Sequence, residues 1–159
     1  MSANLTQMIG DYLDGPRLLR EAVRGLRGEQ LLARPVAGKW STLEVVCHLA
    51  DFEPILADRM KRVIAEDRPQ LVGADENRFA AALTYHERNL EEELNLIEQT
   101  RSQLARILRT LPVEALQRVG VHSERGPRTL EQLLTGAINH IPHHVHFIHD
   151  KRKALGVPA

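Results

Sequence analysis

The sequence predicts an all-α protein built as a four-helix bundle. Four long stretches carry apolar residues at alternating steps of three and four, which is the spacing of one buried helix face. Two of these stretches open on a capping box, in which Ser or Thr is followed three residues later by Glu or Gln. The chain has 159 residues, 43% of them hydrophobic, and we expect residues 1–159 to form a single domain around one core.

The first two helices are predicted over residues 4–26 and 42–66. The apolar residues of the first fall on one stripe, and a Gly-Pro pair midway is expected to kink it. The second begins at the capping box formed by Ser41 and Glu44. A proline in its middle should bend it, because proline lacks the N–H that bonds to the preceding turn.

The last two helices are predicted over residues 78–111 and 129–153. The third carries Leu or Ile at strict seven-residue steps, the repeat of a bundle or coiled coil. Long connections precede both helices, so neighbouring helices need not be antiparallel. The connection over residues 112–128 is expected to hold a short helix followed by a loop or small hairpin.

Histidines are concentrated near the C-terminal end of the chain. Five of the eight lie within residues 140–149, and His140 and His144 form an H-x-x-x-H pair. On a helix, residues four apart lie about 40° apart around the axis and ~6 Å apart along it, so these two rings point the same way. Two imidazoles placed in this way can bind one metal ion.

His48 is the expected third ligand. It lies about two turns into the second helix, between the apolar positions Val45 and Phe52, and should face the core. A catalytic zinc site typically has three protein ligands and leaves one position open for water or substrate. We therefore predict that His48, His140 and His144 together bind a metal ion.

Two other interpretations of these histidines remain open. A single histidine on an apolar face is more often a neutral, hydrogen-bonded core residue, and the C-terminal cluster could be a solvated surface tract. Packing two imidazoles in a core without a metal, an acid or water leaves their nitrogens unpaired, at roughly 1–3 kcal/mol each. Coordination removes that cost, and we favour it. The remaining three members of the cluster should face solvent: His143, His146 and His149.

Three residues near His48 are candidates for a supporting role. Glu44 and Asp51 lie one turn either side of it, and either could accept a hydrogen bond from its second ring nitrogen, although each could equally be a helix cap or a surface carboxylate. Cys47 is the single cysteine, which excludes an internal disulfide. Because it is turned about 100° from His48, we predict that it packs in the core and is not a nucleophile.

Charge and hydropathy exclude several classes of function. Twenty-one basic residues balance 21 acidic ones without a long run of either sign, so the basic surface of a nucleic-acid-binding protein is absent. The N-terminus lacks the basic and apolar regions of a signal peptide, and no run of 18 apolar residues could cross a membrane. We expect a cytoplasmic protein that binds neither nucleic acid nor membrane.

These motifs resemble those of the DinB/YfiT-like metalloenzyme family. The residues that carry the resemblance are Trp40-Ser41, His48-Leu49-Ala50-Asp51-x-Glu53 and His140-x-x-His143-His144. The resemblance covers essentially the whole chain and implies an up-down-down-up bundle, frequent homodimers, and a divalent cation held by His48, His140 and His144. Zinc or nickel is favoured, with iron or manganese as alternatives. His143 matches a histidine that is often found beside the ligands without being one.

Three functions are compatible with such a site. The leading hypothesis, which the resemblance implies, is a metal-dependent S-transferase that activates a low-molecular-weight thiol such as bacillithiol, mycothiol or glutathione for attack on a small electrophile. The alternatives are a metal-dependent hydrolase and a non-enzymatic metal-binding protein of the stress response. The substrate of either enzyme is expected to be a small molecule, and the sequence assigns no catalytic residue beyond the three ligands.

Overall fold

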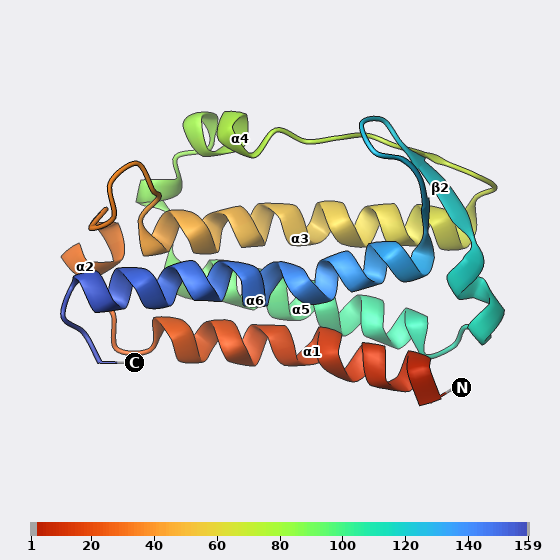
Figure 1. The fold of residues 1–159 in the computed structure, drawn as a ribbon, viewed down its shortest axis with the longest axis horizontal. Coiled ribbons are helices and arrows are strands. Elements are labelled where there is room, and N and C mark those ends of the chain that lie inside the picture. The colour runs from red at the N-terminus through yellow and green to blue at the C-terminus, as the bar shows by residue number, and fades with distance from the viewer. Residues whose placement is uncertain (1–2, 159) are drawn as a thin grey trace.

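The four-helix bundle predicted from the sequence is confirmed. A computed structural model describes residues 3–158, and its long helices are α1 (Ala3–Val23), α3 (Thr42–Ala65), α5 (Leu90–Leu108) and α6 (Leu130–Ala154). The four lie side by side with their axes roughly aligned (Figure 1). No helix in the described range is both long and apolar enough to cross a bilayer.

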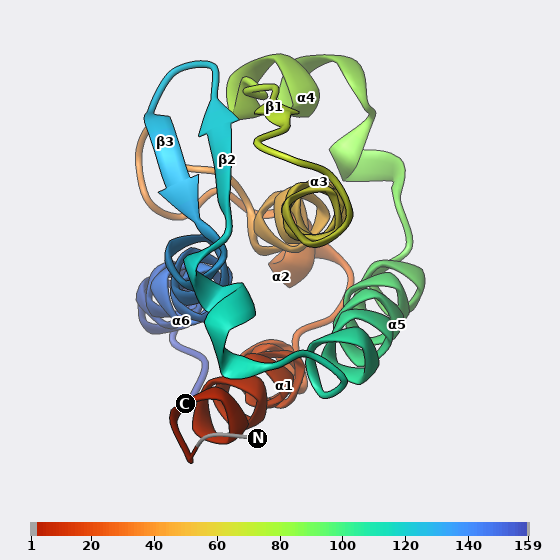
Figure 2. The same cartoon turned by 90° about the vertical axis from the view of Figure 1, so that its right-hand side faces the viewer.

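The four helices run up, down, down and up. Each contributes to two apolar clusters that follow one another along the bundle. The chain passes from the first cluster to the second along α1 and α6, and from the second to the first along α3 and α5, so α1 and α6 are parallel to each other and antiparallel to the other pair (Figures 1 and 2). Representative members of the first cluster are Leu5, Ala57, Leu104 and Leu134, and of the second Leu19, Val46, Ile97 and Ile148.

Short elements complete the fold in the connections between the long helices. They are α2 (Glu29–Leu32), β1 (Gln70–Leu71), α4 (Glu76–Ala82), a 3-10 helix (Tyr85–Glu87), a second 3-10 helix (Val113–Gln117), β2 (Val119–His122) and β3 (Gly126–Thr129). The predicted short helix followed by a hairpin is therefore confirmed, with β2 antiparallel to β3. Strand β1, which the sequence did not suggest, pairs in parallel with β2. Helix α4 lies over the N-terminal half of α3 (Figure 1).

The prediction of one helix over residues 78–111 is wrong. Two residues interrupt it between α4 and α5. Thr84 adopts a left-handed backbone conformation with φ 48°, which a helix interior does not accommodate. Asn89 then caps α5, because its side chain accepts hydrogen bonds from the N–H groups of Glu91 and Glu92. The seven-residue repeat contributes to the core only within α5. Leu83, the first leucine of the repeat in the sequence, lies outside α5 and is 42% exposed.

A buried polar layer joins the four long helices between the two apolar clusters. Arg101 of α5 and Glu53 of α3 are both fully buried, with 2.9 Å between Nη2 and Oε2. The Tyr12 hydroxyl of α1 donates to Glu53 at 2.8 Å, and Arg101 donates to the carbonyl of Ala137 in α6 at 2.7 Å. Every charge in this layer is paired, which is the condition under which buried ions are tolerated. The motif residue Glu53 therefore serves the fold at this level of the bundle.

Close packing explains a glycine in the first helix. Helix α1 continues without interruption through Gly15 and Pro16. A Cβ on Gly15 would overlap Nη1 of Arg101 and lie 3.2 Å from Cδ1 of Ile141. The glycine thus allows the guanidinium to reach the carbonyl of Tyr12, at 2.7 Å.

Candidate metal centre

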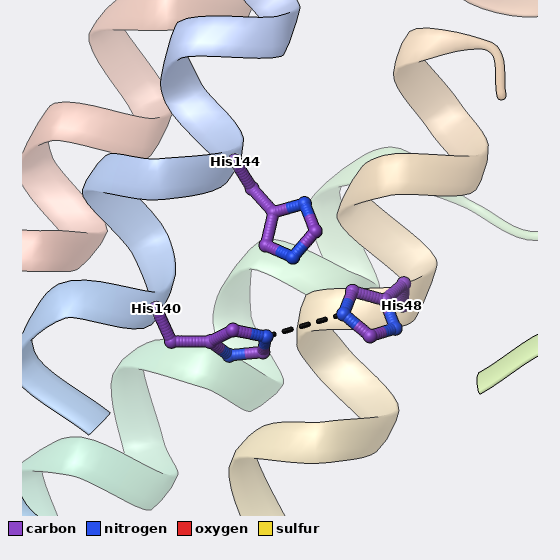
Figure 3. Close-up of side chains that lie close together, drawn as sticks. All are labelled: His48, His140 and His144. Atoms are coloured by element: carbon purple, nitrogen blue, oxygen red, sulfur yellow. Dashed lines mark hydrogen bonds between the residues drawn. The ribbon is translucent and has the colours of Figure 1, made fainter. Parts of the chain in front are cut away.

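The structure brings His48, His140 and His144 together between α3 and α6, as Figure 3 shows. Each ring can offer one nitrogen, and these three atoms all lie within 4.8 Å of one another. The Nε2 atoms of His48 and His140 are 3.2 Å apart. Three imidazoles converging in this way are the donor set of a zinc-type site, in which each nitrogen lies about 2.0–2.1 Å from the ion.

Local sequence sets the position of each ring. Ser41 caps α3 through the predicted reciprocal bonds with Glu44, which fixes the helix register that turns His48 inward. A second capping box at Thr129 starts α6. Although Pro142 lies between the two candidate ligands of α6, the helix continues through it, so the rings of His140 and His144 remain one turn apart with centroids separated by 4.9 Å.

Aromatic side chains surround the three rings and keep them neutral. The ring centroid of His48 lies 5.3 Å from that of Trp40 and 4.5 Å from that of Phe52. Burial lowers the pKa of His48 to about 4. Burial, followed by the proximity of the other imidazoles, lowers the pKa of His140 and that of His144 to about 3. At neutral pH all three are therefore uncharged, which is the state that binds a metal.

One nitrogen of each ring has no protein partner in the part of the chain that the structure describes. The Nδ1 atoms of His48, His140 and His144 are buried, and no protein group in the described range hydrogen-bonds to them. A buried polar atom without a partner costs roughly 1–3 kcal/mol. The convergence of one nitrogen from each ring is therefore what fits a cation, while the Nδ1 atoms stay without a protein partner among residues 3–158.

Neither carboxylate beside His48 supports its ring. Glu44 accepts from the backbone N–H of Ser41 at 2.7 Å and forms an ion pair with Arg34. Asp51 accepts from Arg88 at 2.9 Å. Neither carboxylate bonds to the second nitrogen of His48, because arginines from outside α3 engage both. For Glu44 the structure shows the helix cap, the other of the two roles left open by the sequence. Sequence distance within one helix gave no sign of those partners.

The other three histidines of the C-terminal cluster and the cysteine lie as predicted. The side chains of His143, His146 and His149 are exposed. Cys47 is buried, and its thiol donates to the carbonyl of Tyr85 at 3.4 Å. Burial raises the pKa of this thiol to about 12, so it is protonated at neutral pH. Cys47 is a packing residue and not a nucleophile.

A cleft of about 220 Å³ borders the site at His144. It is lined by His144 together with Trp40, Glu76, Phe147 and Lys151, among others. Glu76 begins α4, and its Oε2 lies 4.0 Å from Nε2 of His48. A larger pocket of about 1040 Å³ lies between α3 and α4, but none of the three histidines lines it. The small cleft is therefore the candidate binding site.

Sequence reasoning missed Glu76 and Lys151. Glu76 falls at the end of a stretch that was expected to be a plain connection, although Asp75 before it is a signal for a helix start and does cap α4 through Asn77 and Arg78. Lys151 lies seven residues after His144, which puts it on the same helix face about two turns further on. That spacing was visible in the sequence.

Comparison with known proteins identifies the family and agrees with the fold. A model described as the DinB superfamily matches residues 12–148. An Oceanobacillus iheyensis protein named "putative metal-dependent hydrolase" is 30% identical over 141 residues, which cover 89% of this chain and 81% of that protein. A Bacillus licheniformis protein with the same descriptive name is 28% identical over 153 residues, or 96% and 87% of the two chains.

Two solved structures share the architecture. YfiT from Bacillus subtilis, described as "a probable metal-dependent hydrolase with an unusual four-helix bundle topology", matches with a TM-score of 0.91 at 24% identity, over 99% of this chain and 91% of that one. A DinB-like protein, also from Bacillus subtilis, matches with a TM-score of 0.63 at 19% identity, over 96% and 94% of the two chains. Since the family model spans most of the sequence and the fold agrees, the chain belongs to the DinB superfamily.

Proposed function

We propose that the protein is a metal-dependent hydrolase of a small molecule. His48, His140 and His144 would hold a divalent cation, and the substrate would lie in the adjoining cleft. The observation that carries the proposal is the convergence of three neutral imidazoles, one buried and two half-buried, beside that cleft. The names of the two bacterial relatives, both "putative metal-dependent hydrolase", support hydrolysis as the reaction.

The ligand set leaves room for a nucleophile. A divalent cation lowers the pKa of a bound water or thiol and so supplies the nucleophile at neutral pH. Glu76 is the side chain placed to receive the proton, because its Oε2 lies 4.0 Å from Nε2 of His48 and it lines the same cleft. Its carboxylate is 56% exposed, so the proton can pass on to solvent.

Thiol transfer is the second candidate reaction. All three donors are uncharged nitrogens, and no thiol or carboxylate of the described residues belongs to the cluster. A thiolate from a small cofactor would be the first anionic donor of such a site, which is a favourable charge balance for a divalent cation.

The cleft argues against the third hypothesis, a non-enzymatic metal-binding protein, because binding a metal needs no cavity beside the ion.

One set of assays separates these functions. The zinc-loaded and nickel-loaded proteins are tested for hydrolysis of ester and amide panels, and for transfer of glutathione or bacillithiol to chlorinated and epoxide acceptors. Hydrolysis that His48→Ala abolishes and that the exposed control His143→Ala retains would support the proposal. Thiol transfer without hydrolysis would replace it with the second candidate, and tight metal binding without either reaction would favour the third.

Glu76 gives a finer test of the hydrolytic reading. Glu76→Gln removes the proton acceptor but keeps the size of the side chain, so kcat should fall by about 10²–10⁴-fold while zinc affinity changes little. The control Glu87→Gln alters an exposed carboxylate elsewhere in the same connection and should leave kcat unchanged. Equal kcat values for both variants would remove Glu76 from the mechanism.

The identity of the native metal and the homodimer implied by the family resemblance stay predictions. Elemental analysis of untagged protein tests the first, and light scattering tests the second.

A further inference from the structure

Lys151 is a buried cation without an acidic partner. The residue is 3% exposed, and its Nζ donates to the carbonyl of Phe147 at 3.2 Å. Among residues 3–158 no carboxylate forms an ion pair with it. Burial is the main cause that lowers the pKa of its ammonium group. A buried charge destabilises the fold unless it is paired. An anionic ligand would supply the counter-charge that Lys151 lacks.

The position of Lys151 connects it to the metal centre. Lys151 follows His144 by seven residues, which on a helix is a rotation of about 700°, roughly 20° short of two full turns. The two residues therefore share one face of α6, and their backbone positions lie about 10 Å apart along the axis. Both line the same cleft, together with Trp40. Because Nζ turns back one turn to the carbonyl of Phe147, a small molecule in the cleft could contact both Lys151 and His144.

The other charges of the cleft leave it positive at the Lys151 end. Lys39 lines the cleft as well, and its charge is one of the causes, after burial, that lower the pKa of Lys151. The one carboxylate of the lining, Glu76, lies near His48. Glu44, the next nearest acid of α3, is already engaged by Arg34. Asp150, whose charge raises the pKa of Lys151, is exposed. Two lysines and one carboxylate therefore line the cleft.

We propose that the substrate carries a carboxylate or similar anionic group, which Lys151 binds at the far end of the cleft while the reacting bond lies at the three histidines. This inference rests on the proposed function only for the position of the reacting bond. The aromatic faces of Trp40 and Phe147 would cover the apolar part of the molecule between its two ends.

Trp40 allows the proposal to be tested without turnover. It is the single tryptophan of the chain and lines the cleft, so its fluorescence reports occupancy. The zinc-loaded protein is titrated with α,ω-dicarboxylates of four to eight carbons and with the matching ω-amide monocarboxylates. We expect one chain length to bind best and its ω-amide to bind roughly 10-fold more weakly or worse, because the amide cannot form a charge-assisted bond with the ammonium.

Variants decide whether Lys151 is responsible. Lys151→Met keeps the length of the side chain and should make the dicarboxylate and the ω-amide bind alike. Lys153→Met alters an exposed lysine in the same last turn and should bind like the wild type. Circular dichroism and zinc affinity establish that Lys151→Met still folds around its metal. Preference for the dicarboxylate that persists in Lys151→Met, or a wild-type protein that binds both compounds equally, would overturn the proposal.

Failure of the proposed function would look different. If the metal hypothesis alone were wrong, His48→Ala would bind the dicarboxylate as the wild type does, and Lys151→Met would still weaken it. That outcome supports an anion site at Lys151 and removes only the reaction assigned to the histidines.

Discussion

Acidification should destabilise the metal-free protein through the three histidines of the candidate site. Burial lowers the pKa of His48 to about 4 and that of His140 and His144 to about 3, whereas the same rings in the unfolded chain titrate near ~6.5. The unfolded state therefore binds protons first as the pH falls. The stability that the neutral rings confer is fully present above the unfolded pKa and is lost as the pH drops toward the folded values.

The magnitude follows from proton linkage. One histidine that is neutral when folded and protonated when unfolded lowers the free energy of unfolding by up to about 1.4 kcal/mol for each pH unit below ~6.5. At pH 5, His140 alone therefore costs up to about 2 kcal/mol relative to pH 7. Two more rings with similar shifts make the slope of the wild type steeper, up to about three times that of one ring.

Urea unfolding in the presence of a chelator, at pH 7, 6 and 5, measures this slope. His140→Gln removes one titrating ring and should flatten the dependence by up to about 1.4 kcal/mol per pH unit. His146→Gln changes an exposed histidine of the same helix and should leave the slope as it is. Identical slopes for wild type and His140→Gln would refute the conclusion that these rings are buried in their neutral form.

Three further predictions concern the frame around the site. Glu53→Gln leaves a buried guanidinium unpaired and should lower the free energy of unfolding in urea by about 3–5 kcal/mol, whereas Asp58→Asn on the exposed side of α3 should change it by less than about 0.5 kcal/mol; equal effects would contradict the buried pair. In thermal melts, Gly15→Ala should destabilise by about 1–3 kcal/mol because its Cβ has no room, and Gly10→Ala, where nothing lies within 4 Å, should stabilise by roughly 0.4–1 kcal/mol; a stabilising Gly15→Ala would disprove the contact. Cys47→Ala should retain metal and activity, and its loss of activity in a folded, metal-loaded protein would restore the thiol as a catalytic candidate.

Local sequence patterns predicted much of the fold and the direction of the three candidate ligands. The capping boxes at Ser41 and Thr129 both formed, and each sets the register of one ligand helix. Because helical periodicity is a local property, the inward direction of His48, His140 and His144 followed from spacing alone. Their convergence across α3 and α6 is a tertiary fact, which the family resemblance had implied.

The failures of prediction have equally specific causes. The leucine spacing continues across Thr84 and Asn89, and the prediction of one helix followed that spacing. In the structure Thr84 interrupts the helix and Asn89 starts the next one. Glu53 pairs with Arg101, which lies 48 positions away in the sequence, and no pattern within α3 predicts that partner. Glu76 reaches the site only because α4 lies over α3 (Figure 1). Long-range contacts of this kind depend on topology, which periodicity does not encode.

Metal stoichiometry tests the central claim most directly. Untagged protein is dialysed against zinc, freed of excess ion, and its zinc content is measured per chain for the wild type, His48→Ala, His144→Ala and the exposed control His143→Ala. We expect one tightly bound zinc in the wild type and in His143→Ala, and loss of tight binding in the two ligand variants. Full zinc occupancy in His48→Ala, or its loss in His143→Ala alone, would contradict the assignment of the metal centre.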